Sequence, residues 1–452
     1  MLIKGQNQQP SFYTMLYDLI PDDHILKRIN QTIDFSFINF QLESSYSKYY
    51  GRPAKEPEMM VKLLILQYLY TLSDVRVIEE ANLNLAYKWF LGLNPEDKLP
   101  DPSLLAKFRV HRLKDNSLDE IITKIVEQCI EKGIIKSTSL SIDATHTAAN
   151  TGKLIPERIM KRLAQKILKK LAKENGTIPE HINQEIPDYK AIEDPQEAKQ
   201  TMKQYLEELI KQAGLIPDIP ETAKTIEKAK QIISEEKFII QKGQRSLVDE
   251  DARVGHKSKI DNFFGYKTEF VMTTDERIIT AVTAESGEYA DGKKFDQLLD
   301  QTQKSGLIAT EMYADKAYFR YDIIKRLKND NIEAYIPVSG SAYRLDEELF
   351  RYNKDSDEWF CIMGNHTLSK CQTKFKRDGK EVPVLEYKFD KAQCQVCTNR
   401  EQCMGKAKTK ARKLRVSINT AELYEISQKQ KTEEFREKYK KRAAHEWKNG
   451  EV

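Results

Sequence analysis

The last fourteen residues of the chain contain Tyr439, Arg442 and Glu446 in a Y-x2-R-x3-E spacing. Successive residues of an α-helix turn by about 100°, so offsets of three and seven place these three side chains on one face. An aromatic ring, a guanidinium and a carboxylate on one face suit a phosphate backbone held beside a metal ion. The spacing therefore predicts a helix that takes part in phosphate chemistry.

Two isolated aspartates lie upstream, and each ends an apolar run: Asp143 after residues 139–142, and Asp315 after residues 312–314. An aspartate that follows a strand is often only a turn residue or a helix cap. Carboxylates at strand ends can also hold Mg²⁺ or Mn²⁺, which prefer oxygen ligands. We expect Asp143, Asp315 and Glu446 to be catalytic and to hold two such ions, roughly 3.5–4 Å apart, that clamp a phosphodiester.

The length and charge of the chain limit its organisation. Its 452 residues are enough for two or three domains. The 73 basic and 69 acidic residues give a net charge of only +4, so any nucleic-acid contact must come from local patches. The longest apolar stretch, residues 59–72, is interrupted by Lys62 and Gln67 and is too short to cross a bilayer. We expect a cytoplasmic protein without a membrane partner.

Hydrophobic periodicity divides the chain into a helical part and a mixed part. Residues 1–136 predict an all-α N-terminal domain, which is either a packed bundle without a ligand or a module that binds DNA ends. Residues 137–452 predict an α/β domain, interrupted by a lysine- and glutamate-rich helical insertion at 154–247 and by an irregular, cysteine-containing insertion at 346–415. The expected strands are 137–142, 264–273, 277–284, a strand leading to residue 315, and 332–338; the expected helices are 293–304, 321–329 and 419–449.

Five of the six cysteines fall in the second insertion. Cys394, Cys397 and Cys403 form a compact trio, and Cys361 or Cys371 could supply a fourth ligand. A structural Zn²⁺ site needs four soft ligands, and a C-x2-C pair places two of them on one turn. Zinc and unliganded thiols both remain open for this cluster.

Several of these blocks together resemble a known family. Ser141-Ile142-Asp143-Ala144-Thr145, residues 313–318 and the Tyr439/Arg442/Glu446 spacing are similar to the catalytic blocks of bacterial insertion-sequence DDE transposases. The most similar group carries the Y-R-E-K signature, Y-x2-R-x3-E-x6-K. Phe264-Gly265-Tyr266-Lys267 resembles that family's second strand, and several blocks between residues 20 and 109 resemble its helical terminal domain. The resemblance covers most of the chain and is weakest at 154–247.

This resemblance implies an α/β ribonuclease H-like catalytic domain with insertions, preceded by the all-α N-terminal domain. Asp143 would lie on its first strand, Asp315 after its fourth and Glu446 on a late helix. Tyr439 and Arg442 would bind the DNA backbone of the transposon end. The implied partners are double-stranded DNA, both terminal inverted repeats and target, and a second copy of the chain in a synaptic homodimer. The implied location is the cytoplasm, at the nucleoid when DNA is bound.

The signature lysine would fall at position 453, one residue beyond this chain. We therefore expect a C-terminally truncated transposase, and a non-catalytic DNA-binding remnant is the alternative. A zinc-stabilised structural protein that reuses the fold is a third hypothesis. His146 is expected to lie on the surface, and Trp447 is expected to pack against the domain. His445, which lies next to Glu446, receives no role.

Overall fold

The computed structural model describes the chain apart from residues 1–10, 48, 52, 114–116, 236, 237, 240–242, 258, 259, 341–345, 378, 379, 406–410 and 452. The chain divides into two compact units. One contains residues 1–143, 270–282 and 291–452, and the other contains residues 144–269 and 283–290. Within the described residues, no helix combines the length and the apolar character that crossing a membrane requires.

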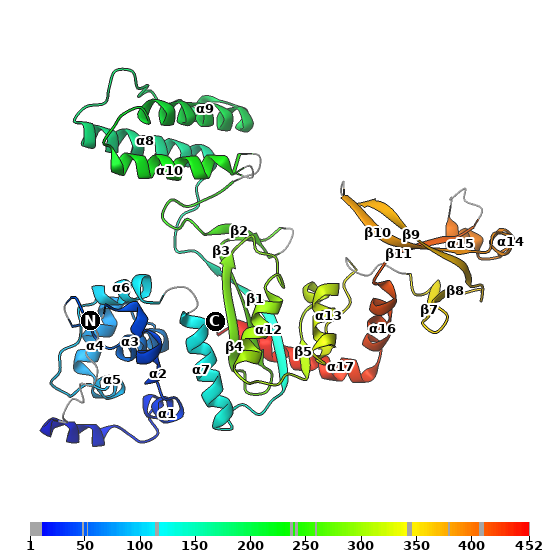
Figure 1. Ribbon diagram of the computed structural model, residues 1–452, viewed down its shortest axis with the longest axis horizontal. Coiled ribbons are helices and arrows are strands. Elements are labelled where there is room, and N and C mark those ends of the chain that lie inside the picture. The colour runs from blue at the N-terminus through cyan, green and yellow to red at the C-terminus, as the bar shows by residue number, and fades with distance from the viewer. Residues whose placement is uncertain are drawn as a thin grey trace. The chain divides into compact units, whose positions relative to one another are not determined.

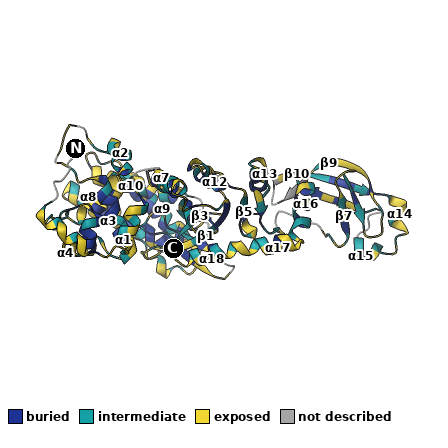
Figure 2. Cartoon of the chain, turned by 90° about the horizontal axis from the view of Figure 1, so that it is seen from below, coloured by how far each residue is buried: buried dark blue, intermediate teal, exposed yellow. Residues whose placement is uncertain are grey.

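The named elements of the described residues between 11 and 131 are all helices, within the stretch 1–136 that was expected to be helical (Figure 1). Leu63 and Leu66 on one helix are fully buried, and Figure 2 shows both buried and exposed residues on these helices. An ion pair of 2.5 Å between Arg109 and Asp74 ties two of the helices together. The elements are η1 (Phe12–Leu19), α1 (Ile25–Thr32), α2 (Phe37–Gln41), η2 (Glu43–Ser45), α3 (Pro57–Tyr70), α4 (Asp74–Leu83), α5 (Leu85–Phe90), α6 (Ser103–His111) and α7 (Ser117–Glu131).

A six-stranded sheet lies at the centre of the mixed part, with the strand order β2-β3-β1-β5-β6 and β4 paired to β3. β1 and β5 are parallel, as are β5 and β6. The predicted helix 321–329 has the expected bounds, and the strand expected at 332–338 is shorter. The elements are β1 (Ser139–Ala148), β2 (Arg253–His256), β3 (Asn262–Thr273), β4 (Ile279–Ser286), α12 (Phe295–Lys304), β5 (Glu311–Tyr313), η4 (Lys316–Tyr318), α13 (Tyr321–Asn329) and β6 (Glu333–Tyr335).

The second unit contains the helical insertion, as the four-residue apolar repeats predict. Isoleucine, leucine and methionine side chains such as Ile167, Met202 and Leu206 form a separate buried core. Lysines and glutamates cover the outer faces. The helices therefore bury their apolar faces against one another and leave their polar faces in water. Figure 1 shows the three long helices side by side. They are α8 (Pro156–Asn175), α9 (Pro195–Ala213) and α10 (Pro220–Ser234), with the short η3 (Tyr189–Ala191) between the first two.

The interpretation of residues 346–415 as irregular was wrong. This segment forms a β7–β8 hairpin and an antiparallel sheet of order β11-β10-β9, whose long strands Figure 1 shows. β9 was missed because polar and charged residues occupy most of its positions, so few apolar residues mark the alternation. The elements are β7 (Phe350–Asn353), β8 (Glu358–Cys361), β9 (Thr367–Arg377), β10 (Lys380–Phe389), α14 (Lys391–Gln395), α15 (Arg400–Met404) and β11 (Lys413–Ser417).

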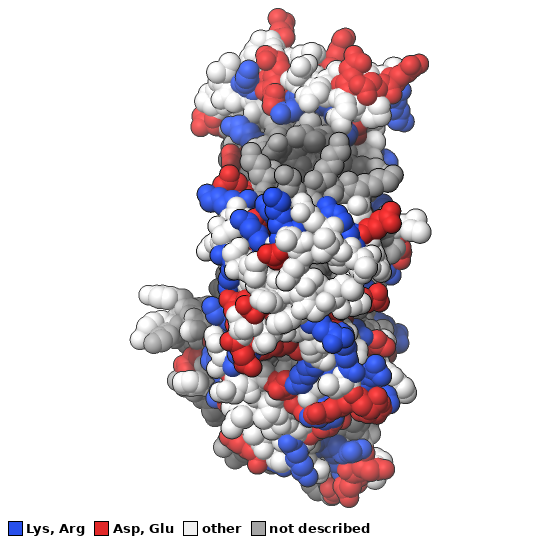
Figure 3. Space-filling view, turned by 90° about the vertical axis from the view of Figure 1, so that its right-hand side faces the viewer, with Lys and Arg blue, Asp and Glu red and all other residues white. Residues whose placement is uncertain are grey.

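The C-terminal segment is helical but is not one continuous α-helix. It consists of α16 (Thr420–Gln430), α17 (Glu433–Tyr439), η5 (Lys440–Arg442) and α18 (Ala443–Asn449). Tyr439, Arg442 and Ala443 all keep right-handed helical φ and ψ, so the direction of the chain persists through the 3₁₀ turn. On the face that Figure 3 shows, lysine and arginine side chains are interspersed with acidic ones, which agrees with a net charge of +4.

Candidate active site

The parallel pairing of β1 and β5 runs up to two residues before each of the two predicted aspartates. Ser139 pairs with Glu311, and Ser141 pairs with Tyr313. Asp143 lies within β1, and Asp315 follows β5. β5 is the fifth strand along the chain and not the expected fourth, since β2 was not predicted.

Arg442 joins two of the three acids. Its Nη2 donates to Asp143 Oδ2 over 3.0 Å, and its Nη1 donates to Glu446 Oε1 over 2.7 Å. The side chains of Arg442 and Asp143 are only 18% and 16% exposed, whereas Glu446 is 62% exposed. Asn449 also donates to Asp143 Oδ2, over 3.4 Å. Residues from β1 and from the end of the chain therefore meet at one guanidinium.

Tyr439 stands within electrostatic reach of all three acids. Burial raises the pKa of its hydroxyl; the nearby charge of Arg442 opposes the rise, and those of Asp315, Asp143 and Glu446 add to it. The ring stacks on Phe435, with centroids 5.8 Å apart and planes at 14°. The structure thus places Asp143, Asp315, Tyr439, Arg442 and Glu446 in one region.

The three acids are close but are not arranged as metal ligands. Asp315 Oδ1 accepts a hydrogen bond of 2.7 Å from the Ala317 amide and caps η4, which is the turn role left open for it. The Asp143 and Glu446 carboxylates both point to Arg442. Over the described parts of the chain, no group of three or more His, Cys, Asp or Glu side chains is placed to hold a metal ion. The two-ion arrangement does not fit the side chains as they stand.

His445, which was given no role, is a buried anchor. It is fully buried, its Nδ1 is 2.9 Å from Ser141 Oγ, and its ring stacks on Phe270 with centroids 4.4 Å apart. Burial and the charge of Arg442 lower the pKa of His445 to about 3, so the imidazole is neutral. Neighbouring residues on a helix point about 100° apart. His445 therefore faces the sheet while Glu446 faces outward.

A second anchor holds the preceding helix. Glu311 at the start of β5 accepts hydrogen bonds from Lys438 at 2.6 Å, Ser139 at 2.8 Å and Tyr313 at 2.8 Å. Burial opposes ionisation, but these hydrogen bonds outweigh it and lower the pKa of Glu311 to about 2. Because Lys438 precedes Tyr439, this cluster fixes α17 against the strand that leads to Asp315.

A surface hollow of about 550 Å³ adjoins Tyr439. Two cationic side chains, Lys431 and Arg436, line it together with Phe435. Its remaining lining residues are Pro337, Val338, Glu347, Ser427 and Gln430.

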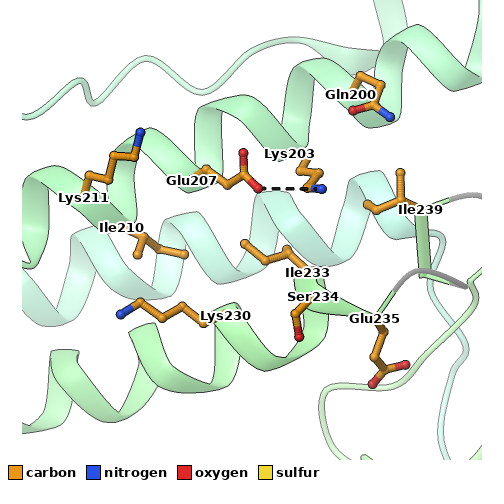
Figure 4. Close-up of a pocket in the computed structure, with 10 residues that line it drawn as sticks. All are labelled: Gln200, Lys203, Glu207, Ile210, Lys211, Lys230, Ile233, Ser234, Glu235 and Ile239. Carbon is orange, nitrogen blue, oxygen red and sulfur yellow. Dashed lines mark ion pairs between the residues drawn. The ribbon is translucent and has the colours of Figure 1, made fainter.

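A second hollow, of about 700 Å³, lies in the helical insertion (Figure 4). Ile210, Ile233 and Ile239 form its apolar floor, and Lys203 pairs with Glu207 across 3.7 Å at its edge. None of the predicted site residues lines it.

The zinc prediction finds no support. Burial raises the pKa of the Cys403 thiol, Arg412 opposes that rise, and three neighbouring thiols add to it. All six cysteines are free, and the described residues contain no metal-holding group. Four cysteines do border one cavity of about 30 Å³, and Cys371 is not among them: Cys361, Cys394, Cys397 and Cys403.

Trp447 lies on the surface, contrary to the expected packing role. It is 69% exposed, and the Arg277 guanidinium lies 5.4 Å from its ring centroid. His146 is exposed, as predicted, and stacks on Phe263 with centroids 4.9 Å apart. Asn449 and His445 were missed as site residues. Asn449 follows Arg442 by seven residues, so the helical spacing that placed Glu446 could have revealed it.

Two family models match the chain. A model described as Transposase domain (DUF772) matches residues 14–111, and one described as Transposase DDE domain matches residues 224–446. The second match begins in the helical insertion and ends at Glu446. No curated protein and no solved structure gives a significant match.

Proposed function

We propose that this chain, which belongs to the DDE transposases of insertion sequences, binds the ends of its element and cuts and joins DNA there. The observation that carries the proposal is the meeting of Asp143 and Glu446, from distant parts of the sequence, at one guanidinium, with Asp315 and Tyr439 beside them. Such a group of three carboxylates, a phenol and a guanidinium suits a phosphodiester.

The catalytic domain of the proposed enzyme is ribonuclease H-like. The strand order β4-β3-β1-β5-β6, with Asp143 on β1 and Asp315 just after the neighbouring parallel strand β5, supports this assignment. Water would first cut the transposon end, and the freed 3′ hydroxyl would then attack a target phosphodiester. Tyr439 and Arg442 would hold the DNA backbone, since a guanidinium can bind phosphate through two parallel hydrogen bonds.

DDE transposases generally use divalent metal ions, and Asp143, Asp315 and Glu446 are the candidate ligands in this chain. Their carboxylates would have to leave the partners that they now have, Arg442 and the Ala317 amide. Mg²⁺ or Mn²⁺ would supply the charge that activates water and stabilises the leaving oxygen.

Residues 1–136 are the part proposed to bind the DNA ends. Two copies of the chain would form a homodimer that joins two ends. The match of residues 14–111 to a transposase domain supports this role. A hollow of about 670 Å³ between the helices supports it further, since Lys55, Lys107 and Arg112 lie along it. Cationic side chains of this kind bind phosphates.

The test uses the purified full chain and DNA that carries both terminal repeats of its element, with Mg²⁺ or Mn²⁺. We expect nicking at the repeat ends. Asp143→Asn, Asp315→Asn and Glu446→Gln should each abolish nicking while they leave end binding intact. If the unsubstituted chain binds the ends but does not nick them with either metal, the catalytic proposal is wrong and a binding-only role replaces it.

A further inference from the structure

Arg442 occupies the place between two of the carboxylates that a divalent ion would need. One arm of the guanidinium is bonded to Asp143 Oδ2 and the other to Glu446 Oε1. The third nitrogen, Nε, is buried and has no hydrogen-bond partner among the described residues. The guanidinium therefore hydrogen-bonds both acids, each through one of its two Nη atoms.

A guanidinium and a metal ion compete for these oxygens. Mg²⁺ and Mn²⁺ bind carboxylate oxygens directly and prefer them to neutral ligands. A divalent ion that joined Asp143 and Glu446 while Arg442 remained between them would meet a positive charge at short range. Opposite charges attract strongly and like charges repel strongly in a partly buried site, where water screens them poorly. The ion can enter only when the guanidinium leaves.

DNA offers Arg442 another partner. A phosphate accepts two parallel N–H···O bonds from a guanidinium as well as a carboxylate does. Tyr439, on the preceding turn and within reach of the same acids, adds a phenol to the same surface. A backbone phosphate bound there would draw Arg442 away from Asp143 and Glu446 and leave both carboxylates for metal.

We propose that Arg442 keeps divalent ions off the Asp143–Glu446 pair until a DNA phosphate takes its guanidinium, so that DNA and metal strengthen each other's binding. This inference rests on the proposed function, since it needs DNA and metal at one site. Coupling between two ligands is reciprocal, so the factor by which DNA tightens metal binding equals the factor by which metal tightens DNA binding. The device would restrict metal-dependent cutting to chains that hold a DNA end.

The test measures Mn²⁺ binding by electron paramagnetic resonance, with and without a duplex that ends at the already cut terminal repeat. Such DNA leaves no bond to hydrolyse, so the readout is independent of cleavage. In the unsubstituted chain we expect DNA to tighten Mn²⁺ binding about 10-fold or more, within the usual range of such couplings. Arg442→Gln should bind Mn²⁺ tightly without DNA, and DNA should then add little.

Control variants make the result specific to this site. Lys440→Gln removes an exposed cation from the same helical segment and should keep the full coupling. Adding Asp143→Asn to Arg442→Gln should remove the gained Mn²⁺ affinity. If Arg442→Gln does not fold, Arg442→Lys keeps the charge but loses the two-armed geometry and should show part of the gain.

The two proposals fail in different ways. If Arg442→Gln binds Mn²⁺ no more tightly than the unsubstituted chain without DNA, the exclusion by Arg442 is wrong, even where DNA nicking is observed. If the unsubstituted chain binds no Mn²⁺ even with end DNA, the metal-dependent function itself is wrong.

Discussion

Ser141 Oγ and His445 Nδ1 lie 2.9 Å apart, and neither side chain is exposed to solvent. Ser141 stands two residues before Asp143, and His445 stands one residue before Glu446. The hydrogen bond therefore joins the two chain segments that carry these acids at a point just inside the site. With the Glu311–Lys438 pair, it fixes the C-terminal helices above the strand ends.

His445→Ala should destabilise the chain and loosen α18. The substitution removes the stacking on Phe270 and leaves the Ser141 hydroxyl buried without this partner, which together cost about 2–4 kcal/mol. Urea unfolding measures the loss, and hydrogen exchange at residues 443–449 should quicken. His111→Ala, on the surface of α6, should stay within about 0.5 kcal/mol. Equal effects of the two substitutions would contradict the anchoring role.

The Glu311 cluster should make stability fall in acid. The pKa of Glu311 is lowered from 4.5 to about 2, so its contribution is complete above pH 4.5 and is lost as pH falls through 2. The shift corresponds to at most about 3 kcal/mol, reduced because Lys438 is 39% exposed. Glu311→Gln should remove this contribution, so its free energy of unfolding should approach that of the unsubstituted chain as pH falls below 4.5. A constant difference from pH 7 to pH 3 would show that ionisation of Glu311 does not stabilise the fold.

The helical elements were largely predictable, because each carries its own apolar face. The repeat of Ile159, Leu163 and Ile167 predicts α8 from sequence alone, and these side chains form the core of the insertion. β2 and the strands of residues 346–415 were not predicted. β2 has four residues with Gly255 among them, and the Gly255 position leaves no room for a Cβ beside Phe263 and Gly287.

The contacts that the expected site residues make were not predictable. Spacing placed Tyr439, Arg442 and Glu446 on one face, although it did not predict the 3₁₀ turn between them. That Arg442 would bridge Asp143 and Glu446 depends on how a strand and a helix about 300 residues apart in sequence pack together, which no local pattern encodes. The role of His445 was also overlooked, because it lies next to Glu446 and adjacent helical positions point in different directions.

Asp315→Asn should separate structure from chemistry. Asn can accept the same hydrogen bond from the Ala317 amide, so the η4 cap should persist and stability should change by about 0.5 kcal/mol or less. Nicking should be lost, because an amide is a neutral and weaker ligand for a divalent ion. Asp315→Ala loses the cap as well and should cost about 1 kcal/mol. Thermal unfolding and the nicking assay distinguish the two variants, and full nicking by Asp315→Asn would remove this residue from the catalytic set.

Lys431 and Arg436, which line the hollow beside Tyr439, should contribute to DNA affinity without reading sequence. A side chain that binds a phosphate releases about one counterion, so replacing either residue by Ala should lower the slope of log affinity against log salt by about 1. The loss should be the same for terminal-repeat DNA and for unrelated DNA of equal length. Fluorescence anisotropy across a salt series measures both quantities, with Lys304→Ala, on α12, as the matched control. Unchanged salt slopes for both variants would place the DNA path elsewhere than over this hollow.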